Sequence, residues 1–269
     1  MSARSARPVG LGIHMPDDYD YSQKPQRRGI QTAPSPPLTT FLLMGICLVA
    51  TLPNIFPALL EQSIWQRVYL SFNGSRDDVW SGRYYILFTA IFSHGSPWHL
   101  LFNMMALFTL GTVLEISIGS LLMMVFVVVS GIICSCAELA ISGELGIGFS
   151  GVIYAMFGMM WAGRGSYPAW ATVANADNFR YAVGWAVFCV FATYFHMMRI
   201  ANSAHFAGLF FGLSIGFAFL APRKRLMWGI PLALLIIIAI LSVTVMPNSA
   251  AWMAWSEPFG ALFHVLTKL

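Results

Sequence analysis

A serine and a histidine stand at the starts of two membrane-length apolar segments. Ser150 lies in the sequence Gly-Phe-Ser-Gly at 148–151, and His205 follows Ser-Ala at the start of a second segment. Polar and ionisable side chains are costly inside a bilayer and are candidate functional residues there. An imidazole beside a hydroxyl can take its proton and make the oxygen a nucleophile. The pattern predicts a serine hydrolase whose reacting pair lies within a membrane.

Glycines accompany both residues. Gly151 and Gly158 follow Ser150 on one helical face, and Gly208 and Gly212 follow His205 in the same way. Small residues let membrane helices approach closely, so these faces predict contact between the two segments. Taken alone, a serine among glycines is also typical of ordinary helix packing.

Three further polar side chains could assist such a pair. His99 and Asn103 are four residues apart, so they share a helix face. An imidazole and an amide there could stabilise an oxyanion, together with the Ser150 N–H. Tyr154 lies one turn after Ser150 and could pack on His205. The alternatives are a polar helix start for His99 and Asn103 and a core aromatic for Tyr154.

The composition indicates a polytopic, all-α membrane protein. Of the 269 residues, 58% are hydrophobic and 10% charged, and the mean hydropathy is +0.70; a soluble domain has about 25% charged residues. Long unalternating apolar runs favour helices over barrel strands. The net charge of +4 lies in the tail and loops and does not indicate nucleic acid. The four cysteines lie in apolar spans without metal spacing, so neither a metal nor a cofactor is expected.

The hydropathy pattern predicts seven spans. They cover about 39–60, 99–118, 121–141, 149–162, 181–197, 204–220 and 227–245. Between the first two spans, Ile64, Trp65, Val68, Tyr69 and Phe72 have the spacing of an interfacial amphipathic helix. Lys and Arg gather in the N-terminal tail and at 223–225, which predicts a cytoplasmic N-terminus. Ser150 and His205 then both lie near the outer membrane face.

The motifs together resemble those of the rhomboid intramembrane serine proteases. His99 to Asn103 resembles the family's His-x-x-x-Asn, 148–151 its Gly-x-Ser-Gly, and 204–212 its Ala-His-x-x-Gly-x-x-x-Gly. Gly111, Glu115 and Gly119 resemble the end of its second helix. The resemblance covers about 65–221. It departs from the family in the first loop, where Tyr85-Ile86 stands in place of a Trp-Arg pair and Arg83 is nearby.

The resemblance implies a six-helix core followed by one C-terminal transmembrane helix. It implies Ser150 as nucleophile, His205 as general base without an Asp, and His99 and Asn103 as oxyanion residues. Tyr154, Gly148, Gly151 and Gly208 would support them. The expected domains are a flexible cytoplasmic tail at 1–37, a catalytic core at 38–222, and an extra helix with an interfacial segment at 223–269.

The expected activity is cleavage of transmembrane helices of other proteins near the outer face of a bacterial inner membrane. Five polar residues could line a water-filled cavity, and three aromatic residues could form a substrate gate. These are Ser93, His94, Ser96, Glu144 and Asn202 for the cavity, and Trp185, Phe188 and Phe191 for the gate. One alternative is a catalytically silent rhomboid-like protein that binds clients or belongs to a complex. A transporter is the other, although Glu115 and Glu138 lie near helix ends rather than midway. The oligomeric state is left open.

Overall fold

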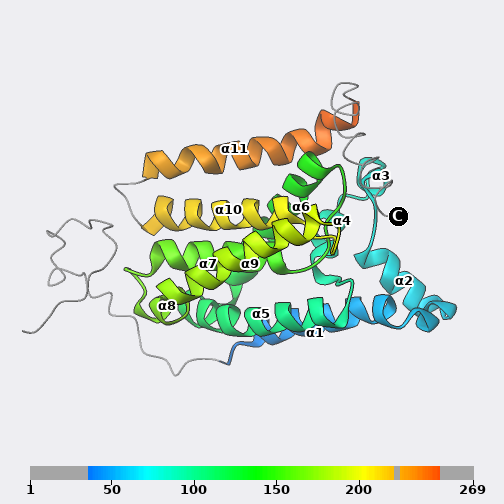
Figure 1. Ribbon diagram of the computed structural model, residues 1–269, viewed down its shortest axis with the longest axis horizontal. Helices are drawn as coiled ribbons and strands as arrows, with labels where there is room; N and C mark the ends of the chain where they lie inside the picture. The colour runs from blue at the N-terminus through cyan, green and yellow to red at the C-terminus, as the bar shows by residue number, and fades with distance from the viewer. Residues whose placement is uncertain (1–35, 221–224, 249–269) are drawn as a thin grey trace, which may run out of the picture. The chain divides into compact units, whose positions relative to one another are not determined.

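The computed structural model describes residues 36–220 and 225–248, and within these ranges every regular element is a helix (Figure 1). Seven long helices correspond to the seven predicted spans, which confirms the all-α fold. They are α1 (Leu38–Ile55), α5 (Pro97–Ile118), α6 (Ser120–Ser142), α7 (Ser150–Gly163), α9 (Ala176–Tyr194), α10 (Asn202–Leu220) and α11 (Arg225–Thr244). The predicted tail, apart from 36 and 37, and the predicted interfacial segment beyond 248 lie outside the described residues.

Five of these helices, α1, α5, α6, α10 and α11, are long and apolar enough to cross a membrane. α7 has only 14 residues, which is about 21 Å of helix against about 30 Å of hydrocarbon. Its short length is compatible with its place at the centre of the bundle, where other helices surround it. α9 carries Asp177 and Arg180 near its start, and is not among the five.

Two predicted boundaries were wrong. The first span was expected to reach residue 60, but α1 ends at Ile55 and a 3-10 helix, η2 (Pro57–Glu61), follows. Pro57 has no N–H and disfavours helical backbone at the residue before it, which ends the helix. α9 starts five residues earlier than expected because Asn175 caps it, accepting the Asn178 N–H at 2.9 Å.

The segment between α1 and α5 folds into short helices rather than a span, as predicted. These are α2 (Ser63–Phe72), α3 (Arg76–Trp80), α4 (Ile86–Thr89) and the 3-10 turn η3 (Ala90–Phe92). Arg83 holds the segment together, since its guanidinium bonds Asp78, the Leu70 carbonyl at 2.7 Å and the Tyr85 hydroxyl at 3.0 Å. The departure from the family's Trp-Arg pair is thus accompanied by an Arg–Tyr–Asp cluster in the same loop.

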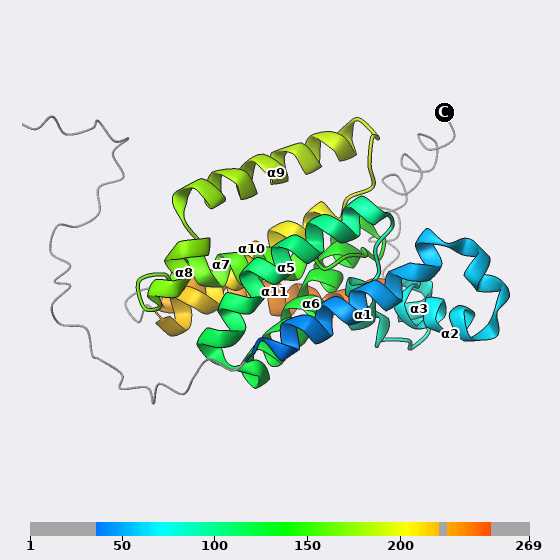
Figure 2. The same cartoon turned by 90° about the horizontal axis from the view of Figure 1, so that it is seen from below.

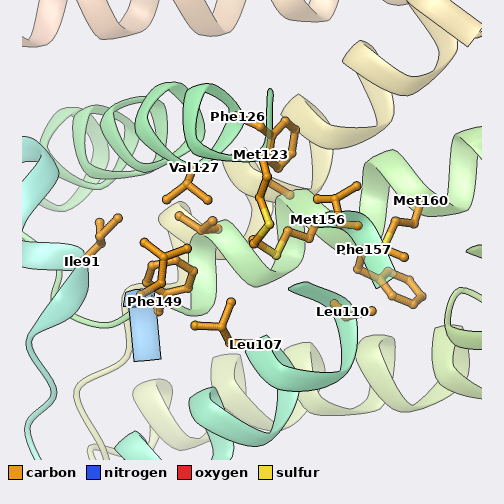
Figure 3. Packing of buried hydrophobic residues seen from close by; sticks show 14 of the residues in the cluster. Ile91, Leu107, Leu110, Met123, Phe126, Val127, Phe149, Met156, Phe157 and Met160 are labelled. Carbon is orange, nitrogen blue, oxygen red and sulfur yellow. The ribbon is translucent and has the colours of Figure 1, made fainter. Parts of the chain in front are cut away.

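The interior is centred on α7, which lies among α5, α6 and α10 (Figure 2). Its apolar side chains, including Met156, Phe157 and Met160, meet Leu107 and Leu110 of α5 and Met123 and Phe126 of α6 (Figure 3). Phe149, immediately before α7, is fully buried in the same cluster. Ser150 therefore starts a helix that is fixed on several sides.

Glycines bring α7 and α10 into backbone contact. A Cβ added at Gly208 would overlap the carbonyl of Gly151, and one at Gly212 would overlap the carbonyl of Ala155. A glycine of α7 makes the same kind of contact, because a Cβ at Gly158 would lie against the Leu209 carbonyl of α10. No larger residue fits here without separating the helices, and this close approach agrees with the sequence prediction.

Glu115, near the end of α5, caps the start of α1. Its carboxylate accepts the backbone N–H groups of Thr39 and Thr40, each at 2.8 Å, together with the hydroxyls of Thr40 and Ser120. The first N–H groups of a helix have no acceptor within the helix. A buried carboxylate that accepts from two such N–H groups and two hydroxyls joins helices rather than lining an ion path.

Candidate active site

Ser150 and His205 lie side by side at the starts of α7 and α10. The Ser150 Oγ is 2.7 Å from the His205 Nε2, within hydrogen-bonding distance. His205 is 4% exposed, whereas Ser150 is half-buried. When the ring is neutral and Nδ1 carries its proton, the hydroxyl donates to Nε2. This is the arrangement that lets an imidazole remove the serine proton during nucleophilic attack.

Tyr154 packs against one face of the His205 imidazole. The two rings stack with centroids 4.9 Å apart and planes inclined by 26°. The Tyr154 hydroxyl donates to the Ala182 carbonyl of α9 at 3.1 Å. His205 Nδ1 has no hydrogen-bond partner among the described residues. The ring is thus oriented by Ser150 and by stacking, and not by a carboxylate on Nδ1.

The turn before Ser150 is built against two histidines. Gly148 has φ +108°, a conformation that favours glycine, and a Cβ there would strike the His99 ring. His94 accepts the Phe149 N–H at 3.4 Å through Nε2, and its Nδ1 donates to the Phe92 carbonyl at 3.1 Å. Burial, followed by the charge of nearby His99, lowers the pKa of His94 to about 3. A neutral His94 can therefore accept from the backbone next to Ser150.

The start of α7 offers donors for a negative charge. The N–H groups of the first turn have no acceptor within the helix, and the helix dipole adds a partial positive charge. Ser150 is the first residue of this turn. When the Ser150 Oγ attacks a carbonyl carbon, the carbonyl oxygen that becomes negative would lie close to these groups.

His99 and Asn103 lie one turn apart on α5. The Asn103 amide donates to the His99 carbonyl at 2.8 Å, which leaves its second N–H available. Asn103 is 5% exposed, and its Oδ1 has no partner within the described part of the chain. The His99 ring packs edge-on against His94 with centroids 4.8 Å apart and interacts electrostatically with His205. His99 lies against the turn before Ser150, because a Cβ added at Gly148 would be 2.6 Å from its ring.

A cavity of about 260 Å³ adjoins His205 between α7, α9 and α10. Its walls are apolar, with Phe157, Phe179, Val190 and Leu209 among them. None of the five polar residues expected to line a water-filled cavity is among the residues that line this one. Ser93 and His94 are fully buried and bonded within the protein, so that prediction was wrong for them. Ser96 instead caps α5, accepting the His99 N–H at 3.2 Å.

α9 is loosely attached to the rest of the bundle. Only Cys189 and Ala192 of this helix are buried. Trp185 meets Phe102 of α5 with centroids 5.8 Å apart and Phe188 at 5.2 Å. Phe191, the third candidate gate residue, is exposed and packs on Phe195. The Phe102–Trp185 contact joins α5 to α9 on this side.

Two residues next to the site were missed or misjudged from the sequence. His94 was expected in a cavity but supports the backbone before Ser150. Glu138 was noted only as a charge near a helix end, yet its carboxylate bonds the residue before His205. Each contact joins positions at least 55 residues apart, so local spacing gives no signal for it.

Comparison with known proteins identifies the family of the chain. The family model described as the Rhomboid domain matches residues 81–222, which is more than half of the chain. The chain belongs to the rhomboid family. It is 35% identical over 151 residues to the rhomboid protease GlpG of Salmonella paratyphi A and 36% identical to that of Salmonella choleraesuis. Each match covers 55% of this chain and 51% of the relative, so the chain spans about half the length of these relatives. As a member of this family with apolar spanning helices, it is an integral membrane protein.

Proposed function

We propose that this protein is an intramembrane serine endopeptidase that cleaves transmembrane helices of other proteins near the outer membrane face. The observation that carries the proposal is the 2.7 Å contact between the Ser150 Oγ and His205 Nε2 at the starts of α7 and α10. The similarity to rhomboid proteases GlpG supports it. Residues 38–222 would form the catalytic core, between a flexible cytoplasmic tail at 1–37 and a segment at 223–269 that holds the extra helix.

In the proposed reaction, the Ser150 Oγ attacks the carbonyl carbon of the scissile peptide while His205 Nε2 takes the hydroxyl proton. The carbonyl oxygen becomes an oxyanion stabilised by the Ser150 N–H and by donors on His99 and Asn103. His205 then gives its proton to the leaving nitrogen, and the C–N bond breaks. Water, deprotonated by His205, attacks the resulting ester and frees Ser150.

Substrate entry is expected between α5 and α9. A transmembrane helix shields its carbonyls within its own hydrogen bonds, so it must unwind locally before attack. Weak helix formers near its outer end would make this easier. Movement of α9 would separate Trp185 from Phe102 and expose Ser150 to lipid. The few buried side chains of α9 support such a movement.

The test is cleavage of a transmembrane substrate by purified protein in proteoliposomes. We expect the wild type to cleave and Ser150→Ala to be inactive while keeping its thermal stability. The matched control is Ser117→Ala, which removes a hydroxyl that bonds only within its own helix on α5. Wild-type cleavage by Ser150→Ala would remove Ser150 from the nucleophile's role.

A catalytically silent client-binding protein is the second candidate, and a fluorophosphonate probe separates the two. The proposed enzyme reacts covalently at Ser150, and reaction is lost in His205→Ala. A silent protein would bind a substrate helix without reacting with the probe. The transporter alternative is disfavoured by the commitment of Glu115 to helix capping.

A further inference from the structure

Glu138 is a buried glutamate outside the proposed reacting groups. It lies near the end of α6 and is 7% exposed. Its Oε2 accepts the backbone N–H of Ala204 at 3.1 Å, and the Ser203 hydroxyl and N–H also face the carboxyl group. Ala204 is the residue before His205. A buried carboxyl thus bonds the backbone one residue from the proposed base.

The contact between Glu138 and Ala204 supplies a side-chain acceptor that the capping residue of α10 lacks. α10 begins at Asn202, so Ala201 stands at the capping position. Ser, Thr, Asp and Asn are preferred there because their side chains accept an N–H of the first turn. The Ala201 methyl group cannot do this. Glu138 provides the acceptor from another helix, 66 residues earlier in the chain.

The same side chain lies against the loop that leads to Ser150. A Cβ built at Gly146 would be 3.3 Å from the Glu138 Cγ and closer still to the Ala201 Cβ. Gly146 is four residues before Ser150. Glu138 therefore packs between the approach to Ser150 and the first turn that carries His205.

The glycine contacts hold α10 against α7, but the His205 ring itself has few direct restraints. Its Nδ1 has no hydrogen-bond partner among the described residues, so the ring lacks the carboxylate that orients the histidine of a Ser-His-Asp triad. The Ser150 contact and the Tyr154 stack act on the ring. They do not set the position of the first turn of α10 along the bundle.

We propose that Glu138 is a positioning residue for the reaction, which caps α10 across the helix interface and keeps His205 Nε2 on the Ser150 Oγ. The inference rests on the proposed proteolytic function. It assigns Glu138 no contact with substrate and requires only that its side chain offer an acceptor to Ala204. A displacement of about 1 Å in a reacting group can lower a rate about a hundredfold.

The experiment compares kcat and KM for two substitutions in proteoliposomes. Glu138→Gln keeps an oxygen acceptor, and we expect kcat within about threefold of the wild type. Glu138→Leu has a similar volume but no acceptor, and we expect kcat to fall about tenfold or more while KM stays within about twofold. Ser130→Ala, which removes a hydroxyl that bonds only backbone carbonyls of its own helix α6, is the matched control and should leave both constants unchanged.

Rescue gives a readout that general destabilisation would not. Ala201→Ser places a local cap at α10, so in the Glu138→Leu background it should recover most of the lost kcat. A wild-type kcat in Glu138→Leu would overturn the proposal. So would a Glu138→Gln variant as slow as Glu138→Leu, or a double variant without recovery.

Two further comparisons keep the result decisive. If Glu138→Leu does not yield folded protein, Glu138→Asp draws the carboxylate back by one carbon–carbon bond, and kcat should fall several-fold at unchanged KM. Wild-type kcat in that variant would overturn the proposal. A wild type that neither cleaves substrate nor reacts with a fluorophosphonate would instead refute the proposed function, which separates the two failures.

Discussion

Tyr154 stacks on the His205 imidazole at 4.9 Å while its hydroxyl donates to the Ala182 carbonyl of α9 at 3.1 Å. Tyr154 thus links the proposed general base to α9, a helix with only two buried residues. The ring and the hydroxyl have separable effects. The ring restrains the imidazole, and the hydroxyl tethers α9.

We expect Tyr154→Ala to lower kcat about tenfold, because an aromatic pair contributes about 0.5–1.5 kcal/mol beyond buried area. Tyr154→Phe keeps the stack and should remain within about threefold of the wild type. Cleavage kinetics in proteoliposomes measure both variants. If Tyr154→Ala turned over at the wild-type rate, the stack would have no part in orienting His205.

Gly208→Ala is predicted to destabilise the protein and to inactivate it. The added Cβ would overlap the Gly151 carbonyl, and overpacking costs on the order of 1–3 kcal/mol. The strain separates α7 from α10 and so Ser150 from His205. Gly184→Ala in α9 is the control, because a Cβ there meets nothing within 4 Å. Thermal unfolding and cleavage are measured together, and equal stability of the two variants would contradict the close packing of α7 on α10.

The sequence predicted the seven helices and the glycine contacts because both depend on local patterns. Apolar runs indicate the approximate helix lengths, and small residues at helical spacing indicate the face on which another helix packs closely. The pairing of Ser150 with His205 followed from their places at the starts of two such helices. Roles taken from the rhomboid resemblance, such as those of His99 and Asn103, remain predictions.

What the sequence did not predict depends on contacts between distant residues. The cap that Glu138 gives to α10 joins α6 to a helix 66 residues later. His94 faces the backbone beside Ser150 instead of water because α1 covers it, with Thr51 Oγ1 3.2 Å from its Nδ1. Polar residue types alone cannot distinguish a cavity wall from a buried hydrogen bond. The apolar cavity beside His205 likewise depends on the placement of α9.

The stability of the protein should fall in acid because of His94. Its pKa is lowered to about 3 in the folded state from the ordinary 6.5. As the pH falls, His94 therefore takes up a proton in the unfolded chain before it does so in the folded protein. The contribution of neutral His94 to folding stability is complete above about pH 6.5 and is lost as the pH falls toward 3. At pH 5 the loss is on the order of 2 kcal/mol. His94→Gln lacks this proton, and its thermal stability should fall less between pH 7 and pH 5. Identical pH dependence of the two proteins would contradict a neutral buried His94.

We predict a cytoplasmic N-terminus and an outward-facing segment after Pro247. The reasons are the Lys and Arg residues of the tail and of 223–225, separated by six helices, with a seventh helix following. Ser2→Cys and Ser249→Cys are labelled in intact cells with an impermeant thiol reagent. Only Ser249→Cys should react before the cells are permeabilised. Equal labelling of both positions would be incompatible with an odd number of spans.

Asn103→Ala should slow the chemical step more than it weakens substrate binding. One amide hydrogen of Asn103 is used by the His99 carbonyl at 2.8 Å, so the second is free to meet an oxyanion. A donor that meets charge only in the tetrahedral intermediate stabilises the transition state and not the bound substrate. Loss of one such donor costs about 3 kcal/mol, or about a hundredfold in kcat.

The measurement is initial rate against substrate concentration in proteoliposomes, with Asn178→Ala, an exposed amide of α9, as control. His99 and the Ser150 N–H can compensate in part, so a decrease of about tenfold still agrees with the role. An unchanged kcat with a higher KM would assign Asn103 to substrate docking instead. The distinction is informative because the buried Asn103 amide keeps one N–H after its bond to the His99 carbonyl, and that N–H could serve either the oxyanion or the bound substrate.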